Sequence, residues 1–275
     1  MAASPIALAQ TVPVRRLPRQ LWFALTMGGL ILAAWAALGW LSASPYGRYV
    51  EHGSYLVPGA FAALCRAVPQ GDIVVPALLH GGVWMLMIAA MMLPTTLPLL
   101  ALFRQITRAR GDANRLSALV IGGFFVVWLA FGLLAHLADA AIDRVAARDA
   151  WFVAHGWLVG AAIVGGAGLF QFSALKYRCL EQCRTPFTFV AARWHGRAPA
   201  REAFRLGVDH GVFCVGCCWA LMLCMFAVGT GSFGWMLVLA ALMAAEKNLP
   251  GGARLRLPVG LGLLAVSGAI IVARV

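Results

Sequence analysis

Charged residues are scarce in this sequence. They make up 12% of its 275 residues, only ten residues are acidic, and the mean hydropathy is +0.84. A soluble globular domain is charged at about a quarter of its positions, so the composition argues against that class. Seven cysteines, an odd number in so long a chain, exclude a small secreted disulfide scaffold. The 62% share of hydrophobic residues excludes a disordered chain, which leaves a polytopic membrane protein.

Motifs of several enzyme and pump classes are also absent. The sequence contains no G-x-S-x-G, no P-loop and no H-E-x-x-H. Its apolar stretches hold no series of carboxylates of the kind that carries protons through a pump. The sequence therefore indicates no reaction, and whether the protein is an enzyme stays open.

Stretches without Asp, Glu, Lys or Arg predict the membrane spans, because a hydrocarbon core about 30 Å thick needs roughly 20 apolar helical residues. They lie between residues 20 and 42, 72 and 104, 115 and 139, and 149 and 176, then from 210 to 245 and from 257 to 273. The stretch from 210 to 245 is too long for one span and contains a glycine-rich turn at 229–234, so it predicts two short helices. We therefore predict one all-α domain over residues 1–275 with about seven spans.

The distribution of basic residues predicts the orientation. Of the 22 lysines and arginines, 17 fall in the N-terminal tail (residues 1–20) and in the loops after the second, fourth and sixth spans. The positive-inside rule then places the N-terminus and the Cys- and Arg-rich loop at 176–209 in the cytoplasm. Because these charges are spread over loops, the net charge of +12 needs no nucleic-acid partner. The lipid bilayer is the expected partner.

The densest polar motif is Asp209-His-Gly-Val-Phe-Cys-Val-Gly-Cys-Cys-Trp219. On a helix, His210 shares one face with Cys214 and with Cys217 and Cys218. Imidazole and thiolate suit soft ions, with Cu(I) favoured and Zn(II) as the alternative. Polar groups in hydrocarbon are costly, so the cluster predicts a metal site, although cysteine also packs as a small hydrophobe. Gly211 and Gly216 would let another helix approach it.

A second pair, Cys179 and Cys183, lies upstream, and i, i+4 spacing puts both sulfur atoms on one side of a helix. The predicted orientation brings this pair to the same membrane face as the first cluster. This pair and the first cluster together favour a shared metal site. The simpler interpretation is that Cys179 and Cys183 are two reduced cytoplasmic thiols.

Glu246-Lys247 is predicted to end the sixth span at the same level. Glu246 would complete the ligand set. The simpler interpretation is a doublet that pairs with itself at the membrane interface, with Lys247 reaching for water.

Methionines form a third group, including Met91 and Met92 in the second predicted span. Thioethers bind Cu(I) and would relay it, but methionine is also ordinary filler in apolar helices. Pro94 and Pro98 predict a kink in this span, with Thr95 and Thr96 bonding the freed carbonyl groups.

These motifs together resemble a bacterial family of predicted metal-binding integral membrane proteins, a domain of unknown function. The resemblance rests on Met91-Met92-Leu93-Pro94, Cys179-x-x-x-Cys183-Arg184-x-Pro186, the block from His210 to Trp219, and Glu246-Lys247. It extends from about Trp84 to Gly252. It implies a multi-pass protein of the bacterial inner membrane with a metal site, and does not identify the metal.

Three functions remain in competition, beside a fourth interpretation as a structural subunit whose cysteines merely pack. The first is binding of a soft metal for transport, delivery or homeostasis, with a metal-donor or acceptor protein as partner. The second is a thiol–disulfide oxidoreductase that uses the C-x-x-C pair Cys214 and Cys217, although oxidative folding suits the outer face better. The third is a metal-dependent membrane enzyme with Glu246 as its base. The expected ligands are His210, Cys214, Cys217, Cys218, Cys179, Cys183 and Glu246.

Overall fold

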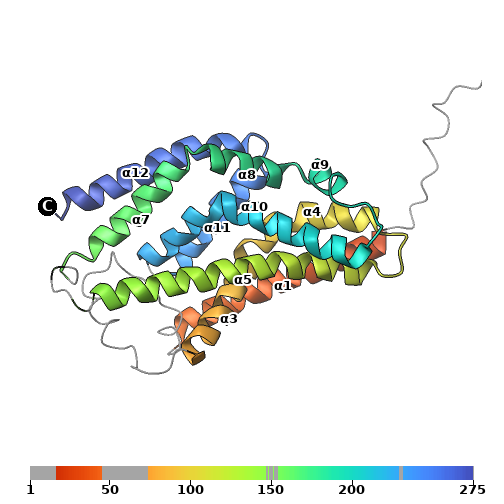
Figure 1. Ribbon diagram of the computed structural model, residues 1–275, viewed down its shortest axis with the longest axis horizontal. Coiled ribbons are helices and arrows are strands. Elements are labelled where there is room, and N and C mark those ends of the chain that lie inside the picture. The colour runs from red at the N-terminus through yellow and green to blue at the C-terminus, as the bar shows by residue number, and fades with distance from the viewer. Residues whose placement is uncertain are drawn as a thin grey trace, which may run out of the picture.

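The structure is a computed structural model, which describes residues 17–44, 74–146, 148, 151, 154–228 and 232–274 (Figure 1). These residues form helices and no strand, which confirms the all-α prediction. The first helices are α1 (Leu17–Ala43), α3 (Val74–Met91), α4 (Leu93–Ile106) and α5 (Ala113–Ala146). They are followed by α7 (Trp157–Phe170), α8 (Ala174–Arg184), α9 (Pro186–Ala191) and α10 (Pro199–Val228). The chain ends with α11 (Phe233–Asn248), the 3-10 turn η3 (Gly252–Leu255) and α12 (Arg256–Val272).

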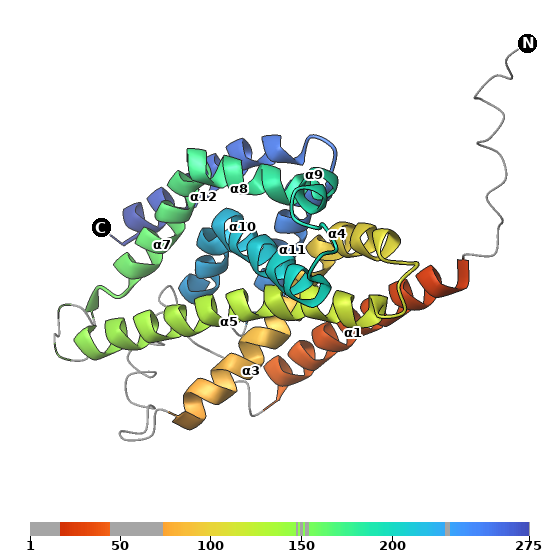
Figure 2. The same cartoon turned by 45° about the vertical axis from the view of Figure 1, so that its right-hand side comes forward.

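Helix α10 forms the centre of the bundle. It packs against α5 on one side and against α7, α8 and α11 on others, and the two views agree that it runs through the interior (Figures 1 and 2). In its most apolar stretch 61% of the residues are buried, compared with 11% in α1. The cysteines of α10 therefore belong to the most enclosed of the four helices that are each long and apolar enough to cross a membrane.

Glycines bring α10 and α5 close together. A Cβ atom on Gly207 would collide with the backbone of Val120, and one on Gly211 would lie 2.9 Å from the Cβ of Val127. Gly123 of α5 faces α10 in the same way. Small residues four apart allow this close packing between apolar helices. The prediction that Gly211 admits another helix is confirmed.

Two helix pairs are sharply bent. Helices α3 and α4 meet at 64° around Met92, and α7 and α8 meet at 66°. At the first break, the hydroxyls of Thr95 and Thr96 donate to the carbonyl oxygen of Met92 at 2.8 and 3.1 Å. The predicted kink and its compensation by threonine are therefore confirmed. The second break has no proline signal in the sequence.

Within the described residues, four helices are long and apolar enough to cross a membrane, or six if each bent pair forms one span. The predicted division of residues 210–245 is confirmed, since α10 ends at Val228 and α11 begins at Phe233. Helix α11 has 16 residues, about 24 Å, and is not among those four. The total of seven spans and the side of the N-terminus stay predictions.

The segment 176–209 is more ordered than the predicted loop. It contains most of α8, all of α9 and the first turns of α10. Lys176 is 0% exposed and Lys247 is 5% exposed. Neither is therefore a surface charge, although the positive-inside rule was applied to both as loop residues. Both side chains have partners inside the protein, Lys176 on Glu246 and Lys247 on Cys214.

Candidate metal centre

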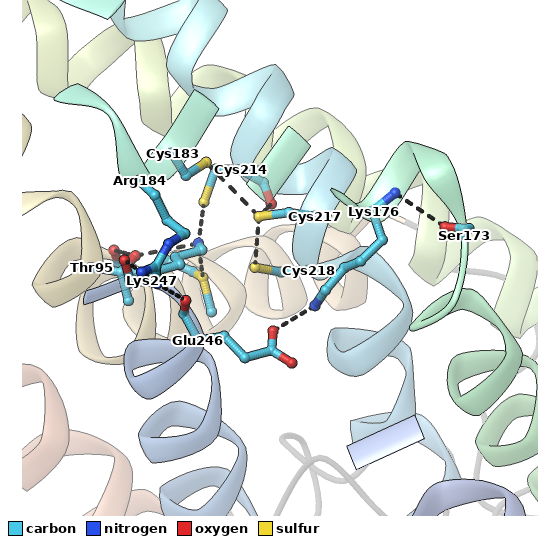
Figure 3. A network of polar contacts seen from close by, with 11 residues as sticks. Thr95, Ser173, Lys176, Cys183, Arg184, Cys214, Cys217, Cys218, Glu246 and Lys247 are labelled. Carbon is cyan, nitrogen blue, oxygen red and sulfur yellow. Dashed lines mark hydrogen bonds and ion pairs between the residues drawn. The ribbon is translucent and has the colours of Figure 1, made fainter. Parts of the chain in front are cut away.

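Three cysteine sulfur atoms form a row between α8 and α10 (Figure 3). The Sγ atom of Cys183, in the last turn of α8, lies 3.9 Å from the Sγ of Cys217. The Sγ of Cys217 lies 3.4 Å from that of its neighbour Cys218. We call Cys183, Cys217 and Cys218 the sulfur row. The structure thus brings together one sulfur of the second predicted pair and two of the first cluster.

The row leads from a partly accessible position into the core. Cys183 is half-buried, whereas Cys217 and Cys218 are each 1% exposed. The thiol of Cys217 also contacts the carbonyl oxygen of Cys214 at 3.2 Å. All six cysteines in the described part of the chain are free thiols. Five of these six cysteines are buried and Cys183 is half-buried, so most of these thiols are kept from water.

Cys179 is buried beside α10 but is not part of the sulfur row. A Cβ atom on Gly216 would lie 2.6 Å from the Sγ of Cys179, so this sulfur rests directly on the glycine. Gly216 therefore makes room for Cys179, one turn of α8 away from Cys183. This agrees with the prediction that Gly216 permits the close approach of another helix.

His210 lies in an aromatic environment. Its ring stacks on Phe124 of α5 at a centroid distance of 5.8 Å and meets Phe189 of α9 edge-on at 5.5 Å. Its Nδ1 atom is buried and has no hydrogen-bond partner among the described residues. The described contacts also include no hydrogen bond from this ring to a cysteine. His210 thus shares the helix with the cysteines while its ring packs between phenylalanines.

Glu246 forms a buried ion pair with Lys176. The Nζ atom of Lys176 lies 2.6 Å from the Oε2 of Glu246, and both side chains are 1% exposed. Lys176 occupies the first turn of α8, just after the bend, where Ser173 caps the helix by accepting from the Lys176 N–H. The Oε1 atom of Glu246 is buried with no hydrogen-bond partner among the described residues. The pair therefore joins the start of α8 to the end of α11 inside the protein.

Lys247 points toward sulfur atoms. Its Nζ donates to the Sγ of Cys214 at 3.0 Å, to the Oγ1 of Thr95 at 3.4 Å and to the Sδ of Met92 at 3.8 Å (Figure 3). The interpretation of Glu246-Lys247 as a self-paired interfacial doublet is therefore wrong. Successive residues on a helix point about 100° apart, so each member of the doublet reaches a different partner in the core.

The end of α11 is fastened by Arg184 of α8. Its guanidinium donates to the carbonyl oxygens of Glu246, Lys247 and Leu249, the last at 2.8 Å. The carbonyls of Glu246 and Lys247 belong to the last turn of α11, where intrahelical donors run out, whereas that of Leu249 also accepts from the Gly252 N–H at 3.0 Å. A cation at a helix C-terminus also complements the helix dipole. Helix α8 thus holds α11 at two points, through Arg184 and through Lys176.

The methionines predicted as filler or relay pack in the same core cluster as the cysteines of α10. The cluster contains Met87, Met91, Met92, Met222 and Met225. Packing accounts for this placement. Met92 differs from the rest through its contact with the Lys247 ammonium.

Among the described residues, the sulfur donors are arranged in pairs and not as a complete ligand set. In the described residues, no group of three or more His, Cys, Asp or Glu side chains is placed to hold a metal ion. The sulfur contacts are instead pairwise. The row therefore offers neighbouring thiol groups, which are donors of the kind that bind soft metal ions.

Arg184 and Lys247 belong to the motifs that carry the family resemblance, but the contacts that Lys176, Lys247 and Arg184 make in this centre were not predicted from the sequence. Each was counted as a loop charge, because it flanks an apolar stretch. The only available signal was the adjacency of the basic residues to the cysteines and to Glu246. Such adjacency does not reveal which way a side chain points.

One family model matches this chain, over residues 81–271, which is more than half of its length. The family is described as a copper chaperone, PpoB2. No curated protein and no solved structure matches the chain. The matched region contains every residue of the sulfur row together with Met92, Lys176, Glu246 and Lys247. The chain belongs to the PpoB2 copper chaperone family.

Proposed function

We propose that this protein is an integral membrane copper chaperone, which binds Cu(I) at the sulfur row and passes it to an acceptor protein. The observation that carries the proposal is the continuity of the row, with 3.9 Å between Cys183 and Cys217 and 3.4 Å between Cys217 and Cys218. An ion held by two neighbouring sulfur atoms moves along such a row by exchanging one ligand at a time. Copper is the cargo, and it stays Cu(I) throughout.

Half-buried Cys183 is the entry to the row, and the buried Cys217 and Cys218 are its inner end. Cys179 is four residues from Cys183 on α8 and serves as a further thiol near the entry. Cys214 lies one helical turn before Cys217 and Cys218, and Glu246 offers its unpartnered oxygen. His210 would join this set only after its ring leaves the phenylalanines that now hold it.

The apolar helices support a multi-pass location in a bacterial inner membrane. The proposed orientation has about seven spans, the N-terminus in the cytoplasm and Cys183 at the cytoplasmic face. Many basic residues of segment 176–209 are partly or fully exposed, among them Arg178, Arg197 and Arg201, as cytoplasmic charges should be. The proposed donor or acceptor protein would dock at this face.

The two alternative functions fit the site less well. A thiol–disulfide oxidoreductase needs a thiol that its substrate can reach, yet Cys214 and Cys217 are 0% and 1% exposed. A metal-dependent enzyme needs a free base near its ion, yet Glu246 is paired with Lys176 at 2.6 Å. Trapping of thiols in whole cells distinguishes the oxidoreductase from a metal-binding protein. Cysteines that cycle between thiol and disulfide would be found partly oxidised, whereas metal ligands would be found reduced.

The proposal is tested by metal content. The full chain, purified in detergent under reducing conditions and loaded with Cu(I), should hold about one copper ion per chain in preference to zinc. The double variant Cys217→Ser and Cys218→Ser should lose this copper. Cys224→Ser is the matched control, because Cys224 is a buried thiol of the same helix that bonds only its own helix carbonyl, at Ala220. Equal copper in the double variant and the wild type would rule out the sulfur row as the site.

A further inference from the structure

Lys247 has unusual partners for a buried cation. The side chain is 5% exposed, and its ammonium group contacts two sulfur atoms and one hydroxyl oxygen, on Cys214, Met92 and Thr95. Sulfur is a weak hydrogen-bond acceptor. The buried carboxylate next to it in sequence, Glu246, is bonded to Lys176 instead. The described contacts of this ammonium group include no carboxylate.

These donors suit a soft monovalent cation better than an ammonium group. A thiolate and a thioether are ligands that select Cu(I), and Met92 lies at the break between α3 and α4, where the helix is interrupted. Cys214 is one helical turn from Cys217 and Cys218, and the Cys217 thiol contacts its carbonyl oxygen at 3.2 Å. The ammonium thus contacts two sulfur atoms, on Cys214 and Met92, that are suitable ligands for Cu(I).

Resting on the copper function proposed above, we propose that Lys247 is a built-in competitor of Cu(I). Its ammonium group covers the sulfur atoms of Cys214 and Met92, gives way when Cu(I) arrives, and returns to help displace the ion. Met92 thereby becomes a further ligand of the transferred copper. In this exchange Cu–S bonds form and N–H···S hydrogen bonds break, any proton on Cys214 passes to solvent, and copper keeps its oxidation state.

A competing group on the same protein lowers the affinity for Cu(I), and a chaperone needs such lowered affinity to pass the ion to an acceptor protein. Lys247 sits on the same protein as the donors, so its effective concentration at the site is high and does not vary with copper supply. The displaced ammonium keeps the hydroxyl of Thr95 as a neighbour, since this oxygen is also within 3.4 Å. The surroundings are otherwise fixed, because Arg184 holds the end of α11.

The test compares Cu(I) affinities of the full chain in detergent, measured by competition with a chromophoric Cu(I) chelator. Removing the competitor in Lys247→Leu should tighten Cu(I) binding about tenfold, the scale of one charge-assisted hydrogen bond, and should slow release to the chelator. Lys247→Arg keeps a cation and should not tighten binding. Met92→Leu should weaken it.

Unchanged or weaker binding in Lys247→Leu would overturn the proposal, because it would make Lys247 a counter-ion that holds the loaded site together. Should the leucine variant fail to fold, Lys247→Gln removes the charge and keeps a polar side chain. Tighter Cu(I) binding in Lys247→Gln would then support the proposal, and unchanged or weaker binding would overturn it. The wild-type measurement is separate. If the wild-type protein binds no Cu(I), the proposed chaperone function itself is wrong. The Cu(I) affinity of the Lys247→Leu variant relative to that of the wild type tests only the role of Lys247.

Discussion

Lys176 and Glu246, seventy residues apart in the sequence, form an ion pair with a separation of 2.6 Å in which each side chain is 1% exposed. The pair joins the start of α8, just after its bend, to the end of α11. Charges so deeply buried are costly to desolvate, and the cost is offset only while both partners are present.

Removing one partner of this pair should therefore be strongly destabilising. Lys176→Met leaves the Glu246 carboxylate buried without its cation, and we expect a loss of about 3–5 kcal/mol in the free energy of unfolding. The double variant Lys176→Met and Glu246→Leu should recover most of this loss. Denaturant unfolding in detergent micelles measures both effects.

The control for this prediction is the partly exposed pair between Arg193 and Asp209, whose side chains are 25% and 33% exposed. Asp209→Asn should cost no more than about 1 kcal/mol. Equal losses for Lys176→Met and Asp209→Asn would show that burial does not set the strength of the Lys176 pair.

The contact between α5 and α10 gives a second prediction, with a matched control one residue away. A Cβ atom on Gly123 would collide with the α10 backbone at Phe204 and would come within 2.9 Å of the backbone nitrogen of Val208, whereas Gly122 has open space around it. Gly123→Ala should lower the melting temperature, because the helices must separate. Gly122→Ala should leave it unchanged or raise it slightly, since alanine favours helix. Matching shifts in the two variants would contradict the close packing.

Much of the fold could be predicted from the sequence, because apolar stretches and glycines act locally. The kink at Met92, the division between α10 and α11, and the close approach at Gly211 all follow from the residues at those positions. The bend between α7 and α8 could not be predicted. No proline marks it, and it is stabilised by a serine cap and by the distant partner of Lys176.

The candidate site was predicted in its residue types and not in its contacts. Helical spacing placed His210 on one face with the cysteines, but Phe124 and Phe189, which come from other helices, decide where the ring lies. Lys247 was interpreted as an interfacial charge because lysine is costly in an apolar interior. Its partner Cys214 lies 33 residues away, and sequence spacing carries no information on such a pairing.

A third prediction concerns the cap on α11. Arg184→Ala should free the end of that helix, because the carbonyl oxygens of Glu246 and Lys247 lose their donor. We expect faster hydrogen exchange at the last turn of α11 and faster release of Cu(I) to a chelator. Arg178→Ala, at an exposed position on the same helix, is the control. Identical exchange and release in both variants would mean that Arg184 does not hold the site.

The most direct test of the copper site is X-ray absorption at the copper edge on the Cu(I)-loaded full chain. The account predicts copper in the Cu(I) state, bound by two or three sulfur atoms, with that signal lost in Cys217→Ser with Cys218→Ser and retained in Cys224→Ser. Copper bound mainly by nitrogen or oxygen, or a sulfur signal that persists in the double variant, would contradict it.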